Sequence, residues 1–221
     1  MCVAKFLHVP KIPVVITVRH PEWILFKQSI EKYAGVRGAV YAPLMHMDLQ
    51  NIKSYHSGRI EIIAKHISSN HTTVLDIGAH WGYHSKYLTK LGKKCLAVEK
   101  NPKVLHFLHK LKVADEISFD IFAENIFNLK QHSFDVVLAL RIFHHFLKRK
   151  NTYNQLKHFL RTLEVKELYF QPHDIKIQKM PNAYKNFDTK EFLNFILYNS
   201  CLNSYQVIGE FVGGKEYKLC R

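Results

Sequence analysis

A turn that contains two glycines is the first candidate for chemistry in this chain. In V-L-D-I-G-A-H-W-G-Y (residues 74–83), Asp76, Gly78 and Gly82 stand where a short apolar strand must end and a helix must begin. Glycine in such a turn permits positive φ and lets a ligand approach the backbone closely. Free N–H groups at the start of the helix favour an anionic group. The turn therefore predicts a ligand site.

A second acidic residue follows at an informative spacing. Glu99 lies in A-V-E-K-N, at the end of the next predicted strand. An acid about 20 residues after a glycine turn, at the end of the second strand, commonly binds ribose hydroxyls. The two features together predict a ligand that contains a nucleoside. The turn has G-x-x-x-G spacing and not G-x-G-x-x-G, which argues against a nicotinamide cofactor.

These stretches match a known family pattern. V-L-D-I-G-A-H-W-G-Y-H-S followed by C-L-A-V-E-K-N-P resembles the first two motifs of class I S-adenosylmethionine (SAM)-dependent methyltransferases, whose first motif reads D-x-G-x-G-x-G. S-F-D-V-V-L-A-L-R-I-F-H-H-F (residues 133–146) resembles the fourth-strand motif of the small-molecule members. The resemblance covers residues 71–175 well and the last strands loosely. His80 replaces the middle glycine of the motif.

The resemblance implies SAM as the cofactor and assigns its binding residues. The glycine loop would hold the methionine part, Glu99 the ribose, and the end of the third strand the adenine, with Glu124 preferred over Asn125. The full predicted set is Asp76, Gly78, Ala79, His80, Gly82, Glu99, Glu124, Asn125 and Leu140.

Histidines provide the candidates for acid–base chemistry. His144 and His145 follow the fourth predicted strand and His173 follows the fifth, and an imidazole can accept a proton near neutral pH. Asp174 would orient His173 or act itself. The alternative for each histidine is a hydrogen-bonded loop residue. His80 and His84 could join His144 and His173 around a metal ion, but no cysteine or carboxylate cluster completes such a site, so we predict no metal.

Arg141 interrupts the apolar end of the fourth strand. We expect it at the mouth of the pocket, where it either binds a carboxylate or phosphate of the substrate or pairs with a loop acid.

The elements that position these residues alternate from residue 71 onward. Short apolar runs predict strands and the segments between them predict helices. This order predicts an α/β fold with a doubly wound, mostly parallel sheet, closed by an antiparallel hairpin around Gly213-Gly214. Residues 71–221 would form the SAM-binding domain. The predicted strands are 73–77, 95–98, 117–123, 134–140 and 167–170, with hairpin strands 205–211 and 216–220, and the predicted helices are 83–91, 102–112, 151–163 and 189–198.

Residues 1–70 lack this regular alternation of strands and helices, and we predict that they form a cap over the pocket. We expect a strand at 14–18, a helix at 22–33, a loop at 35–47 and a helix at 57–67. Several polar and aromatic side chains of this cap would cover the SAM pocket and shape substrate choice. They are Tyr33, Arg37, Tyr41, His46, Asp48, Tyr55, His56 and Arg59.

Composition limits the location and the partners. The four cysteines lack zinc or disulfide-framework spacing, and neither a signal peptide nor a membrane-length apolar run is evident, so we expect a cytoplasmic protein without a membrane partner. The net charge of +14, from 32 basic and 18 acidic residues, attracts polyanions.

The predicted function is methyl transfer from SAM to an oxygen or amine of a small molecule or sugar. The fourth motif lacks D-P-P-Y and N-P-P-Y, which favours these acceptors over exocyclic base amines. Two alternatives remain open: an RNA methyltransferase that uses the basic surface, and a non-catalytic SAM-fold module that binds nucleic acid or a partner protein. The sequence does not predict an oligomeric state.

Overall fold

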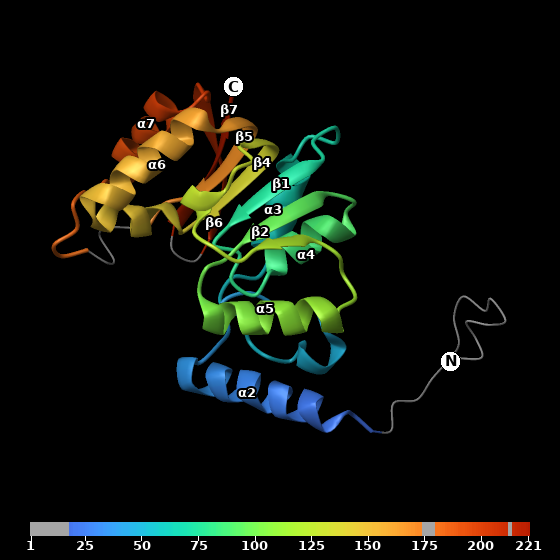
Figure 1. Cartoon of the computed structure of the whole chain (residues 1–221). Coiled ribbons are helices and arrows are strands. Elements are labelled where there is room, and N and C mark those ends of the chain that lie inside the picture. The colour runs from blue at the N-terminus through green and yellow to red at the C-terminus, as the bar shows by residue number, and fades with distance from the viewer. Residues whose placement is uncertain (1–17, 174–179, 212–213) are drawn as a thin grey trace.

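The computed structural model describes residues 18–173, 180–211 and 214–221. Within these residues, seven strands form one sheet in the order β3-β2-β1-β4-β5-β7-β6 (Figure 1). Strands β1 to β5 are parallel, and β7 pairs antiparallel with both β5 and β6. The prediction of a mostly parallel sheet with a C-terminal hairpin is confirmed. The strands are β1 (Thr73–Ile77), β2 (Lys94–Val98), β3 (Asp120–Phe122), β4 (Ser133–Leu140), β5 (Glu164–Gln171), β6 (Ser204–Phe211) and β7 (Gly214–Cys220).

Helices cover both faces of the sheet because successive strand residues point to opposite sides. Val74 and Val136 pack into one apolar cluster with helices α3, α4 and α5, whereas Leu75 and Val137 pack into another with α6 and α7 (Figure 1). These helices are α3 (Arg59–His66), α4 (Tyr83–Lys90), α5 (Pro102–Ala114), α6 (Lys150–Thr162) and α7 (Thr189–Asn199).

The chain changes direction across the sheet between β1 and β4. From β1 it proceeds through β2 to the edge strand β3, and then returns to β4 on the other side of β1. The segments that follow β1 and β4 therefore leave the sheet in opposite directions and open a crevice at the carboxyl ends of the strands. This is the edge where the candidate residues are expected.

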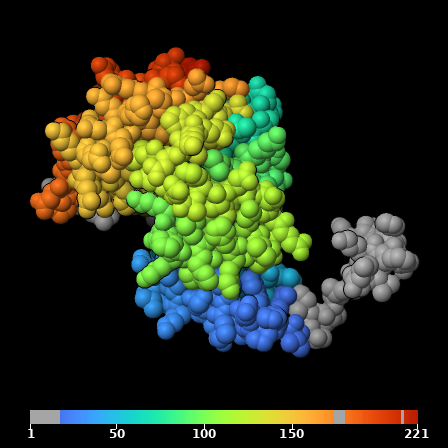
Figure 2. Space-filling model, in the orientation of Figure 1, coloured from blue at the N-terminus to red at the C-terminus, as the bar shows by residue number. Residues whose placement is uncertain are grey.

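The N-terminal segment packs against α5. Its helix α2 (Pro21–Arg37) begins at a proline and ends at Gly38, which has a left-handed φ of 80°. Phe26 and Ile30 of α2 join Trp81 and Leu111 in a third apolar cluster. In Figure 2 the blue surface of α2 lies directly against the green surface around α5.

Several expected bounds differ from the structure, and β5 runs over Glu164–Gln171 and not only over 167–170. The third strand is Asp120–Phe122 and not 117–123, because it pairs only with Leu96–Val98 of β2. Helix α2 runs past the expected end at residue 33, up to the Gly38 cap. The segment after β4 is not a loop but a 3-10 helix, η3 (Phe143–Lys148). The expected strand at 14–18 lies almost entirely outside the described residues.

Short 3-10 helices occupy two further connections, η1 (Met47–Leu49) and η2 (Ile126–Asn128). In the part of the chain that the structure describes, every helix is too short or too polar to cross a membrane.

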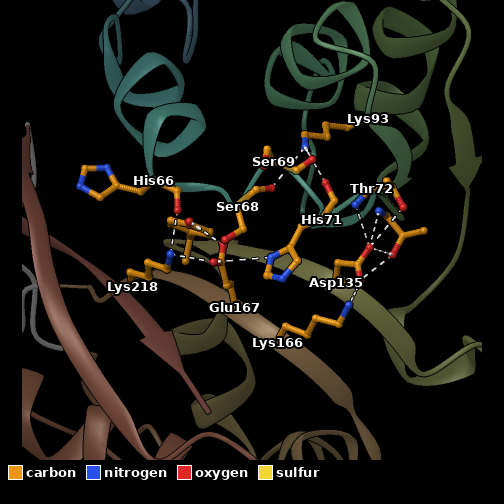
Figure 3. A network of polar contacts seen from close by, with 12 residues as sticks. His66, Ser68, Ser69, His71, Thr72, Lys93, Asp135, Lys166, Glu167 and Lys218 are labelled. Carbon is orange, nitrogen blue, oxygen red and sulfur yellow. Dashed lines mark hydrogen bonds and ion pairs between the residues drawn. The ribbon is translucent and has the colours of Figure 1, made fainter.

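A polar network fixes the strands at the opposite, amino-terminal edge of the sheet (Figure 3). One oxygen of Asp135 on β4 accepts hydrogen bonds from the backbone N–H and the hydroxyl of both Thr72 and Thr73, at 2.8 to 3.3 Å. Its other oxygen pairs with Lys166 of β5 at 2.7 Å. This carboxylate therefore ties the beginning of β1 to β4 and β5.

We predict that Asp135→Ala destabilises the fold by about 1–3 kcal/mol, because the Thr72 and Thr73 donors lose a charged acceptor. Burial alone would raise the pKa of Asp135, but hydrogen bonds from Lys166, Thr73 and Thr72 outweigh it and hold this pKa well below its usual range. The stabilisation is therefore complete above the unfolded-state pKa of about 4 and decreases as pH falls below it.

Urea denaturation between pH 7 and pH 3 measures this difference. Asp120→Ala, at an exposed carboxylate of β3, is the matched control and should change stability little. Equal losses in the two variants, or an Asp135 effect that does not change with pH, would contradict the assignment.

Candidate functional site

A cavity of about 890 Å³ lies at the carboxyl ends of the parallel strands. Each strand contributes the residues at its end, and η3 and the N-terminal segment complete the wall. The lining residues at the strand ends are Ile77 and Gly78 (β1), Val98 and Glu99 (β2), Glu124 and Asn125 (β3), Leu140 and Arg141 (β4), and His173 (β5). The predicted edge of the sheet is therefore the edge that carries the cavity.

The glycine turn contacts both neighbouring strands. The N–H groups of Gly78 and Ala79 donate to the carbonyl of Val98 on β2, at 2.9 and 3.0 Å. Gly78 has a φ of +73°, and a Cβ atom there would lie 2.9 Å from the Ile142 side chain that follows β4. Glycine is thus required at the point where the segments after β1 and β4 meet.

His80 has a backbone conformation that favours glycine. Its φ is +52°, a left-handed value that costs a non-glycine residue about 1–2 kcal/mol. The imidazole stacks on Trp81 with ring centres 5.1 Å apart and contacts Tyr41 at 5.3 Å. Burial, with the charge of Arg37, lowers the pKa of His80 to about 4, so the ring is neutral at pH 7. Ring packing holds this strained residue in the cavity wall.

Glu99 is held rigidly at the wall of the cavity. One carboxylate oxygen accepts the backbone N–H groups of Lys100 and Asn101, both at 2.9 Å. The other accepts the N–H of His80 at 3.3 Å. The acid predicted to bind ribose is therefore fixed beside the glycine turn before any ligand binds.

The other loop residues of the predicted cofactor set lie differently. Asp76 is buried and accepts a hydrogen bond from the Ser85 hydroxyl at 2.8 Å, and burial raises its pKa to about 6. Asp76 and Ala79 line a much smaller pocket behind the turn. Gly82 lines neither space and begins α4 with a φ of +79°. These three residues shape the turn from behind the cavity wall.

The residues predicted to contact adenine lie together after β3. Glu124 is exposed and accepts a hydrogen bond from the Asn128 amide at 3.1 Å. Asn125 uses its side-chain carbonyl to accept the N–H of Phe127 and so begins η2. Glu124, Asn125 and Leu140 all line the cavity.

The three candidate catalytic histidines form one cluster. The ring of His144 lies 4.0 Å from that of His145 and stacks on His173 at 4.5 Å, measured between centres. Burial, followed by the neighbouring histidine charges, lowers the pKa of His144 far below 6.5, and partial burial with Lys148 also lowers that of His145. His144 and His145 are therefore neutral at pH 7, and both line the cavity, where a neutral imidazole can accept a proton.

The structure separates the histidines that were considered as metal ligands. His84 is buried, away from the cluster, and its pKa falls to about 3 through burial and the charge of Arg59. Among the described residues, no three His, Cys, Asp or Glu side chains converge in a way that would hold a metal ion. Asp174 lies outside the described residues.

Part of the N-terminal segment reaches the cavity. Tyr41, Tyr55 and His56 line it, as expected of a cap, and the rings of Tyr41 and His56 pack with their centres 4.6 Å apart. Asp48 instead pairs with Arg19 and Trp23, below the cavity.

Arg59 was predicted as a cap residue but makes a different contact. It is completely buried, with its Nε 3.5 Å from a carboxylate oxygen of Glu216 on β7, which is equally buried. Burial raises the pKa of Glu216 to about 8, although the Arg59 charge opposes this. Sequence reasoning missed Glu216, because its alternating hairpin strand gives no sign of a distant cation.

Lys100, Lys148 and Met180 also line the cavity and were not predicted. Lys100 directly follows Glu99, so its place in the sequence could have indicated that it lies at the cavity. Met180 gave none, because it lies outside the described helices and strands.

Comparison with known proteins matches the part of the chain that builds this edge. Residues 75–165 match the model of a protein family described as a methyltransferase domain. The ubiquinone biosynthesis O-methyltransferase of Nitrosococcus oceani is 33% identical over 90 residues, which are 39% of this chain and 38% of that protein. The match spans well under half of that relative.

Solved structures share the fold. The bifunctional kinase-methyltransferase WbdD superimposes with a TM-score of 0.68 at 15% identity, over 86% of this chain and 46% of its own. The N-methyltransferase NodS of Bradyrhizobium japonicum WM9 gives 0.55 at 12% identity, over 73% of this chain and 92% of its own. Because residues 71–221 are only about two thirds of the chain, the WbdD match must include part of the N-terminal segment.

Two glycines with the same backbone conformation give a matched test of the turn. Gly82 and Gly92 have φ of +79° and +82°, but a Cβ at Gly82 would lie 2.4 Å from Leu108, whereas one at Gly92 meets nothing. We predict that Gly92→Ala costs about 1–2 kcal/mol for its backbone alone. Gly82→Ala should cost about 1–3 kcal/mol more, because its methyl group overpacks the core.

Chemical denaturation of the two variants gives both values. Equal destabilisation would show that the contact between Gly82 and α5 is not tight.

Proposed function

We propose that this chain binds SAM in the cavity and methylates an oxygen or amine of a small molecule or sugar. The match of residues 75–165 to a methyltransferase-domain family supports this proposal. The observation that carries the proposal is the position of Glu99. Its carboxylate is fixed by three backbone N–H groups at the wall, beside the glycine turn. A carboxylate in this position is suited to accept hydrogen bonds from the two hydroxyls of a ribose.

The residues present fit this cofactor. The close contact between Gly78 and Ile142 leaves no space for a side chain in the turn, so the backbone itself forms the wall there. Glu124 and Asn125 continue the wall after β3, on the same side as Glu99. We assign this side, formed by the ends of β1, β2 and β3, to SAM.

The histidine cluster suits the removal of a proton from the acceptor. Bound SAM supplies a methyl group as a sulfonium, and an acceptor hydroxyl or ammonium loses a proton when it accepts that group. His145 is the most exposed ring of the cluster and its lowered pKa keeps it neutral, so we assign it as the base. His144 packs beside it and in turn stacks on His173, which limits the orientation of the cluster.

The size of the cavity supports a small acceptor. A volume of about 890 Å³ is within the range of small-molecule and cofactor sites. The name of the Nitrosococcus relative specifies an oxygen acceptor for that protein, which supports oxygen here. Tyr41, Tyr55 and His56 lie on the wall, so we assign the choice of acceptor partly to the N-terminal segment.

The first test of the proposal is SAM affinity measured by calorimetry. We expect Glu99→Ala to weaken SAM binding at least tenfold, because the ribose loses a charged acceptor. Glu210→Ala, at an exposed glutamate of β6, is the control and should bind SAM as the wild-type does. Absence of SAM binding at millimolar concentration, or full affinity in Glu99→Ala, would refute the proposal.

The second test concerns the base. With an acceptor identified by screening hydroxylated and aminated compounds with methyl-labelled SAM, His145→Ala should lower turnover about a hundredfold and leave SAM affinity unchanged. Because the pKa of His145 is lowered, the acidic limb of the wild-type pH profile should lie below pH 6.5.

His158→Ala, at an exposed histidine of α6, is the control for this change and should keep full turnover. Unchanged turnover in His145→Ala would remove this residue from the reaction.

A further inference from the structure

The cavity has a cationic side that the cofactor assignment does not use. We propose, as an extension of the function proposed above, that the methyl acceptor carries an oxyanion, a carboxylate or phosphate, which binds the guanidinium of Arg141. This group would anchor the acceptor on the β4 side of the cavity, beside the histidine cluster.

Arg141 is held in a strained backbone conformation at the end of β4. Its φ is +55°, a region that non-glycine residues rarely adopt. Its N–H donates to the carbonyl of Gln171 on β5 at 3.0 Å, which fixes this turn. Such strained residues concentrate at functional sites, where the surrounding structure compensates for them.

The guanidinium of Arg141 lacks an acidic partner in the described part of the chain. It is partly buried and lines the cavity, and its side chain makes neither an ion pair nor a hydrogen bond there. Burial is the main reason for the low pKa of His56 and of His144, but the charge of Arg141 contributes to both. Arg141 therefore lies near both rings, which also line the cavity.

Both acidic residues of the cavity lie on one side of it, together with Lys100, whereas the described ionisable residues on the β4 side are cations and imidazoles. Glu99 and Glu124 are on the wall formed by β2 and β3, and both already accept hydrogen bonds from neighbouring protein groups. Arg141 and Lys148 follow β4, and neither forms a salt bridge within the described residues. A neutral acceptor would leave these cations without a counter-charge.

The cofactor would strengthen this asymmetry, because the sulfonium of SAM adds a positive charge. An anionic acceptor complements it, and the planar guanidinium binds carboxylate or phosphate through two parallel hydrogen bonds. This binding would also orient the acceptor relative to His145.

The experiment uses the full chain saturated with S-adenosylhomocysteine. Calorimetry measures the binding of benzoate, phenyl phosphate and the neutral analogue benzyl alcohol. We expect at least one anion to bind at least tenfold more tightly than benzyl alcohol, and the comparison of the two anions identifies carboxylate or phosphate as the preferred group.

Arg141→Gln should weaken binding of the preferred anion at least tenfold without changing the affinity for S-adenosylhomocysteine. Arg149→Gln is the matched control, because it removes the same charge from an exposed residue outside the cavity wall, and it should weaken binding less than twofold. Lys148→Gln, at an exposed side chain, gives an independent test if Arg141→Gln does not fold, with an expected loss of about threefold.

Three results would overturn the inference: equal affinity for the anions and benzyl alcohol, equal losses in the Arg141 and Arg149 variants, or an unchanged Arg141 variant. Equal losses would indicate a diffuse polyanion surface, as expected for RNA. Failure of the wild-type protein to bind S-adenosylhomocysteine would instead refute the proposed function.

Discussion

The parallel pairing of β1 with β4 is the constraint on which the rest of the site depends. These strands are neighbours in the sheet although some 60 residues separate them in the chain, and their register pairs Val74 with Val136. Asp135 fixes the pair at the amino-terminal edge, and the contact of Gly78 with Ile142 closes it at the carboxyl edge. The glycine turn and Arg141 thereby become parts of the wall of one cavity.

The division of the cavity follows from this topology. Strands β2 and β3 lie on one side of β1 and bring both acidic side chains, together with Lys100, whereas β4 and β5 lie on the other and bring imidazoles and cations. A ligand that spans β1 therefore meets two environments of different charge. One edge of the sheet can therefore bind two molecules of different charge without a separate domain for each.

Local sequence patterns predicted the features that repeat along the chain. Alternating apolar runs predicted the strands of the sheet, and the interval between the turn and Glu99 predicted that both lie on one edge. Features that depend on contacts between distant residues were missed. Asp76 has the motif position of a ligand-binding acid, but its orientation toward Ser85 depends on how α4 packs. The partner of Arg59 lies on β7, which no local pattern indicates. The end of α2 was placed too early, because Gly38 was not recognised as its cap.

The buried pair of Arg59 and Glu216 has a consequence for the integrity of the whole chain. One partner belongs to the N-terminal segment and the other to the last strand, and water reaches neither. Removal of Glu216 would leave the Arg59 guanidinium in the interior without its partner, at a cost of about 3–5 kcal/mol. The two ends of the chain are thus thermodynamically coupled. A truncation at residue 70 would not release an independently stable domain, and the N-terminal segment and the sheet should unfold in a single cooperative transition.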